Sequence, residues 1–148
     1  MPGLQLSYSM ALGEGNDTLR EPFRMNNIFL SHETRITTFT VQAYSGDGKE
    51  GGGYPASYEG YSFFGEFTLP SFPLSIFGRY DYFKTSRMGV GIFTPDINKI
   101  LIGGLAWKFY KDNRLIIDIE RSIYERGVGG PALTPEETIA ELALEIVF

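Results

Sequence analysis

The chain has 148 residues, contains no cysteine and carries a formal net charge of −5. This length is enough for one domain with a core or a small barrel, and too short for two ordinary domains. The lack of cysteine excludes disulfides, thiolate chemistry and sulfur-ligated metal sites, and the acidic balance argues against nucleic acid as a partner, because phosphate binding needs a basic patch.

The composition favours β structure. Glycine is abundant, with 18 residues, and the 12 Phe and 9 Tyr give an unusually aromatic chain. No apolar run approaches the roughly 20 residues of a membrane helix. A slightly negative mean hydropathy fits a water-soluble protein and a membrane β-barrel equally well, because half of each barrel strand faces a polar interior.

Turn-rich stretches divide the chain into about eight predicted strands. The connections between them alternate between long and short, as in an up-and-down antiparallel barrel with short turns on one side of a membrane and long loops on the other. The long connections are residues 13–22, 45–57, 85–98 and 125–137. The predicted strands are residues 4–12, 23–31, 35–44, 60–69, 74–83, 100–110, 114–124 and 140–148.

Most predicted strands alternate between apolar and polar side chains, which is the pattern of a strand with one face in lipid and the other in a polar lumen. The strand at residues 23–31 is ambiguous in phase. The predicted lipid-facing belt consists of Leu101, Leu105, Trp107, Phe109, Leu115, Ile117, Leu142, Leu144 and Phe148. The predicted lumen-facing charges are Glu66, Arg79, Asp81, Lys108, Asp118, Glu120, Glu141 and Glu145.

The C-terminal segment also has a helical interpretation. Thr134 is a suitable N-cap, Pro135 a suitable first helical residue, and Ile139, Leu142 and Ile146 then follow at helical spacing. Strict alternation of apolar residues from residue 140 to the end indicates a strand instead, and the pattern in the rest of the chain favours the strand.

Several features resemble bacterial outer-membrane porins. Phe148 is preceded by apolar residues at every second position, and residues 78–83 and 104–115 place aromatic side chains just before a polar turn. The resemblance covers the second half well and the first third weakly. It implies an all-β, antiparallel, up-and-down transmembrane barrel of about eight strands spanning residues 1–148, either complete or part of a larger porin.

The resemblance also implies a location and partners. We expect the chain in a bacterial outer membrane, with the lipid bilayer or detergent around it and with the barrel-assembly machinery reading its C-terminal strand. Residues 1–4 lack the charged and apolar regions of a signal peptide, so this reading requires a mature form or a fragment. The implied function is passive passage of ions or small solutes, with neither enzyme activity nor a cofactor.

Candidate chemistry in the chain is weak. Asp118 and Glu120 could act as an acid and base pair, but alternate positions of any polar strand face produce such pairs. His32 is the single histidine, which leaves no zinc or Ser-His-Asp site. The glycines at residues 51–53 lack the flanking pattern of a phosphate loop. Acids outnumber bases among the predicted lumen residues, which predicts a mildly cation-favouring interior or, alternatively, a structural ion-pair network.

Two other functions remain open from the sequence. A closed membrane barrel could have a structural or adhesive role through its long loops. A soluble lipocalin-like binder would use the same alternation with the apolar residues inside and the polar residues outside. The direction of Leu105, Trp107 and Leu144 separates the lipocalin-like alternative from the membrane barrels.

Overall fold

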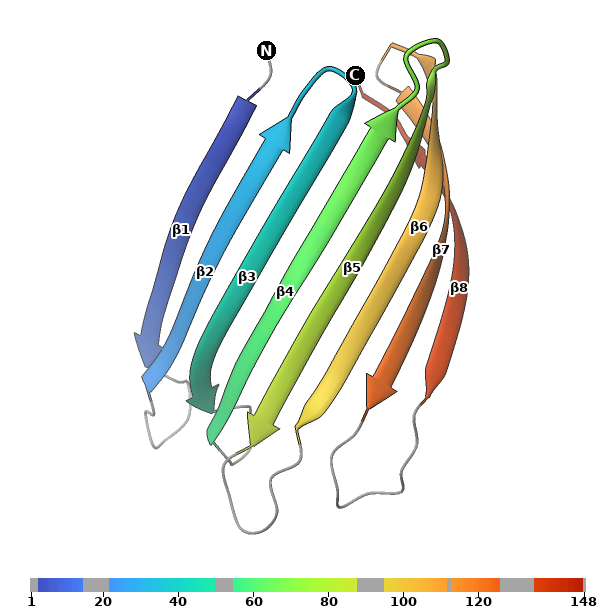
Figure 1. The fold of residues 1–148 in the computed structure, drawn as a ribbon. Helices are drawn as coiled ribbons and strands as arrows, with labels where there is room; N and C mark the ends of the chain where they lie inside the picture. Colours follow the sequence, from blue (N-terminus) through green and yellow to red (C-terminus); the bar gives the residue numbers. More distant parts are fainter. Residues whose placement is uncertain are drawn as a thin grey trace.

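The computed structural model describes residues 3–14, 22–49, 55–87, 95–111, 113–125 and 135–147. Eight strands form one antiparallel sheet in the order of the chain, as Figure 1 shows. The strands are β1 (Gly3–Glu14), β2 (Pro22–Glu33), β3 (Thr37–Lys49), β4 (Pro55–Thr68), β5 (Leu74–Arg87), β6 (Asp96–Tyr110), β7 (Asn113–Glu125) and β8 (Glu136–Glu145). The prediction of eight up-and-down antiparallel strands is confirmed. Within the described ranges, no helix has the length and apolar character needed to cross a membrane.

The strands extend further into the predicted long connections than the sequence indicated. β3 continues to Lys49 through Gly46 and Gly48, residues that usually weaken a strand. Aromatic rings from the neighbouring strands cover these glycines, with Tyr58 over Gly46 and Phe23 beside Gly48. Cross-strand packing therefore supports strand structure where local propensity predicts a loop.

The C-terminal segment is a strand. β8 pairs with β7 continuously from Glu136 to Glu145, so the helical interpretation of this segment is wrong. The expected strand began at residue 140, whereas β8 begins four residues earlier. Thr134 and Phe148 lie outside the described residues.

Three short turns lie at one end of the sheet, which we call the turn end. In the first, the Thr34 amide donates to the Thr37 carbonyl at 2.7 Å and the Thr34 hydroxyl accepts from the Thr37 amide at 2.9 Å. In the second, the Leu69 amide donates to the Leu74 carbonyl at 2.9 Å. In the third, Lys111 has a φ of 50°. Both ends of the chain also lie at the turn end (Figure 1).

The sheet is curved but open. β1 pairs with β2 only and β8 with β7 only, so the described strands do not close into a ring. The sequence predicted closure, and the structure differs because alternation and turn length encode pairing between chain neighbours. Pairing of the first strand with the last depends on strand tilt and stagger, which no local pattern records.

The described residues form no ordinary hydrophobic core. Ala106 is the one apolar side chain among them that is buried, and none of their large side chains is completely buried. A soluble domain of this size normally buries many large apolar residues. The fold therefore leaves its apolar side chains on a surface.

Candidate functional site

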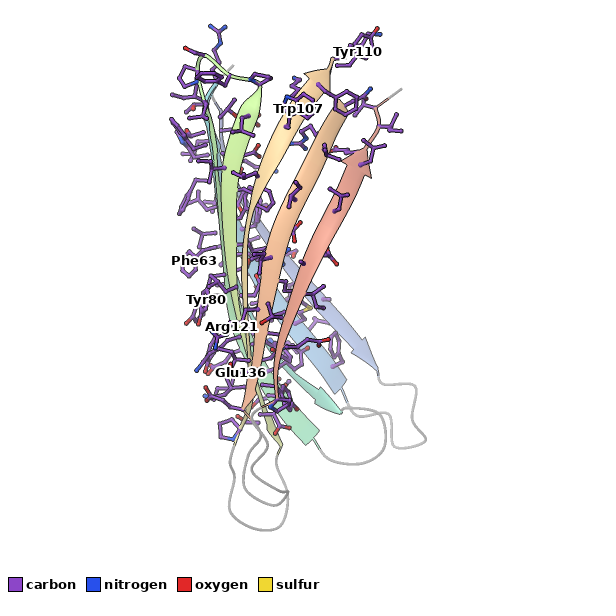
Figure 2. All side chains as sticks on the ribbon, turned by 90° about the vertical axis from the view of Figure 1, so that its right-hand side faces the viewer. Phe63, Tyr80, Trp107, Tyr110, Arg121 and Glu136 are labelled. Carbon is purple, nitrogen blue, oxygen red and sulfur yellow. The ribbon has the colours of Figure 1, made fainter. Side chains whose placement is uncertain are left out.

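One face of the sheet is apolar across all eight strands. Residues that pair directly across neighbouring strands share a face. The register joins Leu6, Leu30, Val41, Phe63, Tyr80 and Leu101 into one row over β1 to β6, and Leu105, Ile117 and Leu142 into another over β6 to β8. Phe63 and Tyr80 point away from the sheet on its outer side in Figure 2. We call this surface the convex face. Its side chains are strongly exposed, with Leu6 at 68% and Leu142 at 71%.

The convex face carries the belt that the sequence predicted. The register places Leu101, Leu105, Trp107, Leu115, Ile117, Leu142 and Leu144 on it. Phe109 follows the same side next to a β-bulge, with its ring centroid 6.0 Å from that of Trp107. Phe148 lies outside the described residues.

The predicted belt was incomplete in the first half of the chain. The register adds β1 and β2 to the convex face through Leu4, Leu6 and Leu12 and through Ile28 and Leu30. The strict alternation from residue 4 to residue 12 already contained this signal. In β2, runs of adjacent apolar residues hide from the sequence which side chains share a face. Cross-strand pairing decides this assignment.

Charged residues of the convex face gather at the end opposite the turns. Three cross-strand ion pairs lie there: Lys84 with Glu59 at 2.7 Å, Lys99 with Glu125 at 2.5 Å, and Arg121 with Glu136 at 2.6 Å. Figure 2 shows Arg121 and Glu136 near this end and Trp107 near the turn end. We call these six residues the ion-pair row.

Aromatic rings cluster on both sides of the apolar band. Next to the ion-pair row, Tyr61 stacks on Tyr82 with ring centroids 4.9 Å apart, and its ring also lies 6.1 Å from that of Tyr80. At the turn end, Trp107 and Phe109 form a second cluster. Rings with a polar edge prefer the boundary between apolar and wet surroundings.

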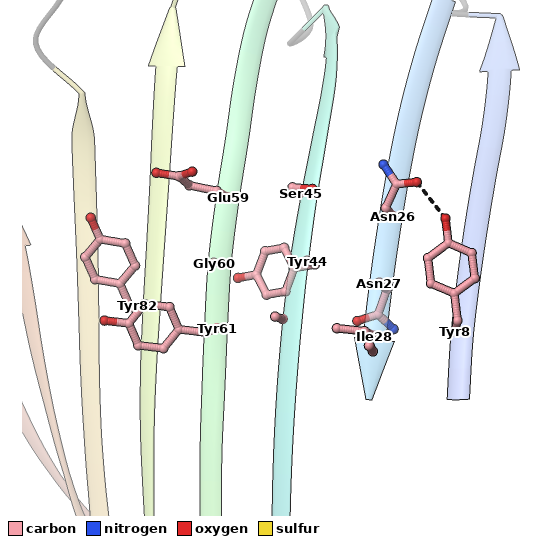
Figure 3. Close-up of a pocket in the computed structure, with 11 residues that line it drawn as sticks. Tyr8, Asn26, Asn27, Ile28, Tyr44, Ser45, Glu59, Gly60, Tyr61 and Tyr82 are labelled. Atoms are coloured by element: carbon pink, nitrogen blue, oxygen red, sulfur yellow. Dashed lines mark hydrogen bonds between the residues drawn. The ribbon is translucent and has the colours of Figure 1, made fainter. Parts of the chain in front are cut away.

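A hollow of about 490 Å³ lies beside the tyrosine cluster (Figure 3). The small side chains of Ala43 and Ser45 lie among the residues that line it. On β1, the Tyr8 hydroxyl donates to the Asn26 side-chain oxygen at 2.9 Å. The hollow therefore has apolar walls and a polar margin on the side of the ion-pair row.

The opposite, concave face carries the predicted lumen charges. The register places all eight on this face: Glu66, Arg79, Asp81, Lys108, Asp118, Glu120, Glu141 and Glu145. The Arg79 guanidinium lies 2.8 Å from the Asp81 carboxylate. The Arg114 guanidinium contacts Glu145 at 2.8 Å and Glu66 at 3.6 Å.

The pair between Arg114 and Glu66 shows the curvature of the sheet. Arg114 belongs to β7 and Glu66 to β4, with β5 and β6 between them. Side chains of strands so far apart meet only on the inside of a curved sheet. Together with Lys108, Arg35 and Glu145 they line a cavity of about 330 Å³ near the turn end.

Polar character is uneven across the concave face. β1, β2 and β3 present a row of uncharged groups, in which the Gln42 amide donates to Asn27 at 3.0 Å and Asn27 donates to Ser9 at 3.4 Å. The predicted lumen charges all lie on β4 to β8. β4 to β8 therefore carry the predominantly acidic part of the concave face, and β1 to β3 carry this neutral, hydrogen-bonding row.

The residues that the sequence singled out for metal or catalytic chemistry do not form a cluster in the described part of the chain. No group of three or more His, Cys, Asp or Glu side chains within them is placed to hold a metal ion. Glu120 accepts a hydrogen bond from the Ser122 hydroxyl at 3.1 Å, and His32 is exposed on the convex face at the turn end. The glycines at 51–53 lie outside the described ranges.

A scan against protein-family models, a search of curated proteins and a search of solved structures each found no match to this chain.

Proposed function

We propose that this chain forms the wall of a porin-like β-barrel in a bacterial outer membrane, with its concave face lining a path for ions or small solutes. The convex face carries the proposal, because it is apolar over eight strands while the described residues bury almost no apolar side chain. Covering a Leu or Ile side chain with hydrocarbon is favourable by about 1.5–3 kcal/mol relative to water. A face of this extent needs an apolar environment.

The dimensions of the apolar band support a bilayer as that environment. On β5 the convex face has no formal charge from Leu74 to Tyr82, beyond which Lys84 joins the ion-pair row. This stretch is about 27 Å long along the strand, or about 21 Å along the axis of a barrel whose strands tilt by about 40°. Apolar bands of outer-membrane barrels are about 25 Å tall and have aromatic residues at both margins.

A lipocalin-like binder fits the arrangement poorly. Such a protein keeps its apolar residues inside a closed barrel. Leu105, Trp107 and Leu144 lie on the convex face, with exposed fractions between 45% and 58%. The predicted lumen charges lie on the concave face instead, which suits a wet lumen.

The charges of the concave face support a preference for cations. Six of the predicted lumen residues are acids, whereas Arg79, Lys108 and the neighbouring Arg114 are bases. Their summed field attracts cations and repels anions, most strongly where a narrow lumen limits screening by water.

Planar-bilayer recordings on the chain refolded in detergent test the proposal. We expect stepwise conductance, with reversal potentials in a KCl gradient that favour K⁺ over Cl⁻. Insertion without conductance would favour a closed barrel with a structural or adhesive role. A chain that stays in solution and does not float with lipid vesicles would contradict the membrane assignment.

A further inference from the structure

The two outer strands leave unpaired edges. β1 and β8 each pair on one side only, so each presents a row of backbone N–H and C=O groups without a strand partner. The described side chains of β1 are exposed on both faces, and so are those of β8 up to Leu144. In hydrocarbon an unsatisfied backbone group costs several kcal/mol, and open sheet edges do not occur there. If the proposed function is correct, something must pair with both edges.

The two edges are complementary to each other. β1 and β8 run antiparallel, and joining them with both convex surfaces outward continues the apolar face from Leu142 and Leu144 to Leu4 and Leu6. On the concave side β1 offers hydroxyl and amide donors, and β8 offers carboxylate acceptors. The donors are Gln5, Ser7 and Ser9, and the acceptors are Glu137, Glu141 and Glu145.

The concave face is arranged for a wide lumen. Several aromatic rings lie along the wall, over a glycine of the adjacent strand. A Cβ atom at Gly60 would lie 2.5 Å from the Tyr44 ring, and one at Gly104 would lie 2.5 Å from the Phe77 ring. An eight-stranded barrel has an interior just wide enough to be filled by side chains, whereas here the walls of β1 and β8 do not contact each other.

We propose that a second copy of this chain closes the barrel. β1 of each copy pairs with β8 of the other, and a two-fold axis along the barrel repeats the junction and leaves no edge. The two junctions are equivalent under the two-fold axis, so the contact between the copies is isologous and closes the ring with two chains. The product has sixteen strands, a number that leaves an aqueous channel. This inference rests on the proposed membrane function and explains how eight strands could conduct.

Disulfide trapping tests the junction directly, because the chain has no cysteine. Ser7→Cys would be combined in turn with Ile139→Cys, Glu141→Cys and Ala143→Cys, all on the concave side of β8. Paired antiparallel strands bring Cα atoms to about 4.5–5.5 Å, which a disulfide can span. After refolding with lipid and oxidation, we expect at least one pair to give a covalent dimer on non-reducing gels.

Two controls accompany these variants. Ser7→Cys with Leu142→Cys places the thiols on opposite faces and should remain monomeric. Ser7→Cys alone should also remain monomeric, because the two-fold axis puts the two Ser7 residues at different junctions. Dimers in either control at the level of the test pairs would show random collision and overturn the proposal.

The other outcomes separate this inference from the proposed function. A disulfide within one chain would show that β1 pairs with β8 in the same molecule, and no disulfide in any pair would show that another partner covers the edges. Both results overturn the two-copy barrel, yet flotation with vesicles and conductance would still support the membrane function. A covalent dimer that fails to float would contradict the membrane function while leaving the strand pairing intact.

Discussion

Replacing Ile119 with arginine distinguishes a lipid-facing surface from a water-facing one. Ile119 is the central residue of β7, lies on the convex face and is 57% exposed. If lipid surrounds this face, Ile119→Arg puts a charge inside the apolar band, one convex-face position before Arg121 of the ion-pair row, and costs about 1–3 kcal/mol of unfolding free energy, between the midplane and interface values. If water surrounds it, the same change at an exposed site alters stability by no more than about 0.5 kcal/mol.

The neighbouring Glu120→Gln is the matched control. It has the same depth in the sheet but lies on the concave face, where its carboxylate accepts from Ser122. Its replacement should cost about 1 kcal/mol or less, because the amide can still accept that hydrogen bond.

Urea unfolding of the chain in phosphocholine vesicles measures both variants. With a slope of about 2 kcal/mol per molar urea, Ile119→Arg should lower the unfolding midpoint by about 0.5–1.5 M. Leu144→Arg, close to the turn end, should cost a similar amount, because the penalty falls toward either interface. Midpoints of Ile119→Arg and wild type that agree within error would refute the assignment of the convex face to lipid.

Two further predictions concern the concave face. Neutralising Asp118 and Glu120 together, as Asp118→Asn with Glu120→Gln, should reduce the K⁺ preference measured by reversal potential without unfolding the protein, and unchanged selectivity would contradict the electrostatic argument. Gly60→Ala should destabilise the sheet by about 1–3 kcal/mol, because the added methyl would overlap the Tyr44 ring and the Tyr82 backbone carbonyl oxygen. Gly65→Ala on the convex face, where a Cβ meets nothing within 4 Å, serves as the control in the same urea titration, and equal losses would count against crowding as the cause.

The faces of the sheet were more predictable from sequence than its closure. A period of two residues fixes which side chains share a face, so the positions of Glu66, Trp107 and Leu142 followed from alternation. The period is clear in β7, where Ile117 and Ile119 alternate with Asp118 and Glu120. It failed in β2, where Ile28, Phe29 and Leu30 are consecutive and only pairing with β3 sets the phase.

Contacts between distant strands could not be predicted. The meeting of Arg114 with Glu66 depends on the curvature of four strands, which no local sequence pattern records. The strand continuing through Gly46 and Gly48 was missed for the same reason, since glycine is locally a loop signal. Long-range geometry therefore decided both the site and the strand ends.

The position of the chain ends has a consequence for how such a barrel could be built or evolve. Because the number of strands is even, β1 begins at the turn end and β8 ends there. In the two-copy barrel, the end of β8 of one copy would therefore lie beside the start of β1 of its partner. A short linker could join them without crossing the membrane. Tandem duplication of the coding sequence would then turn a two-chain barrel into a single-chain barrel of the same strand number, with every strand already in its final direction.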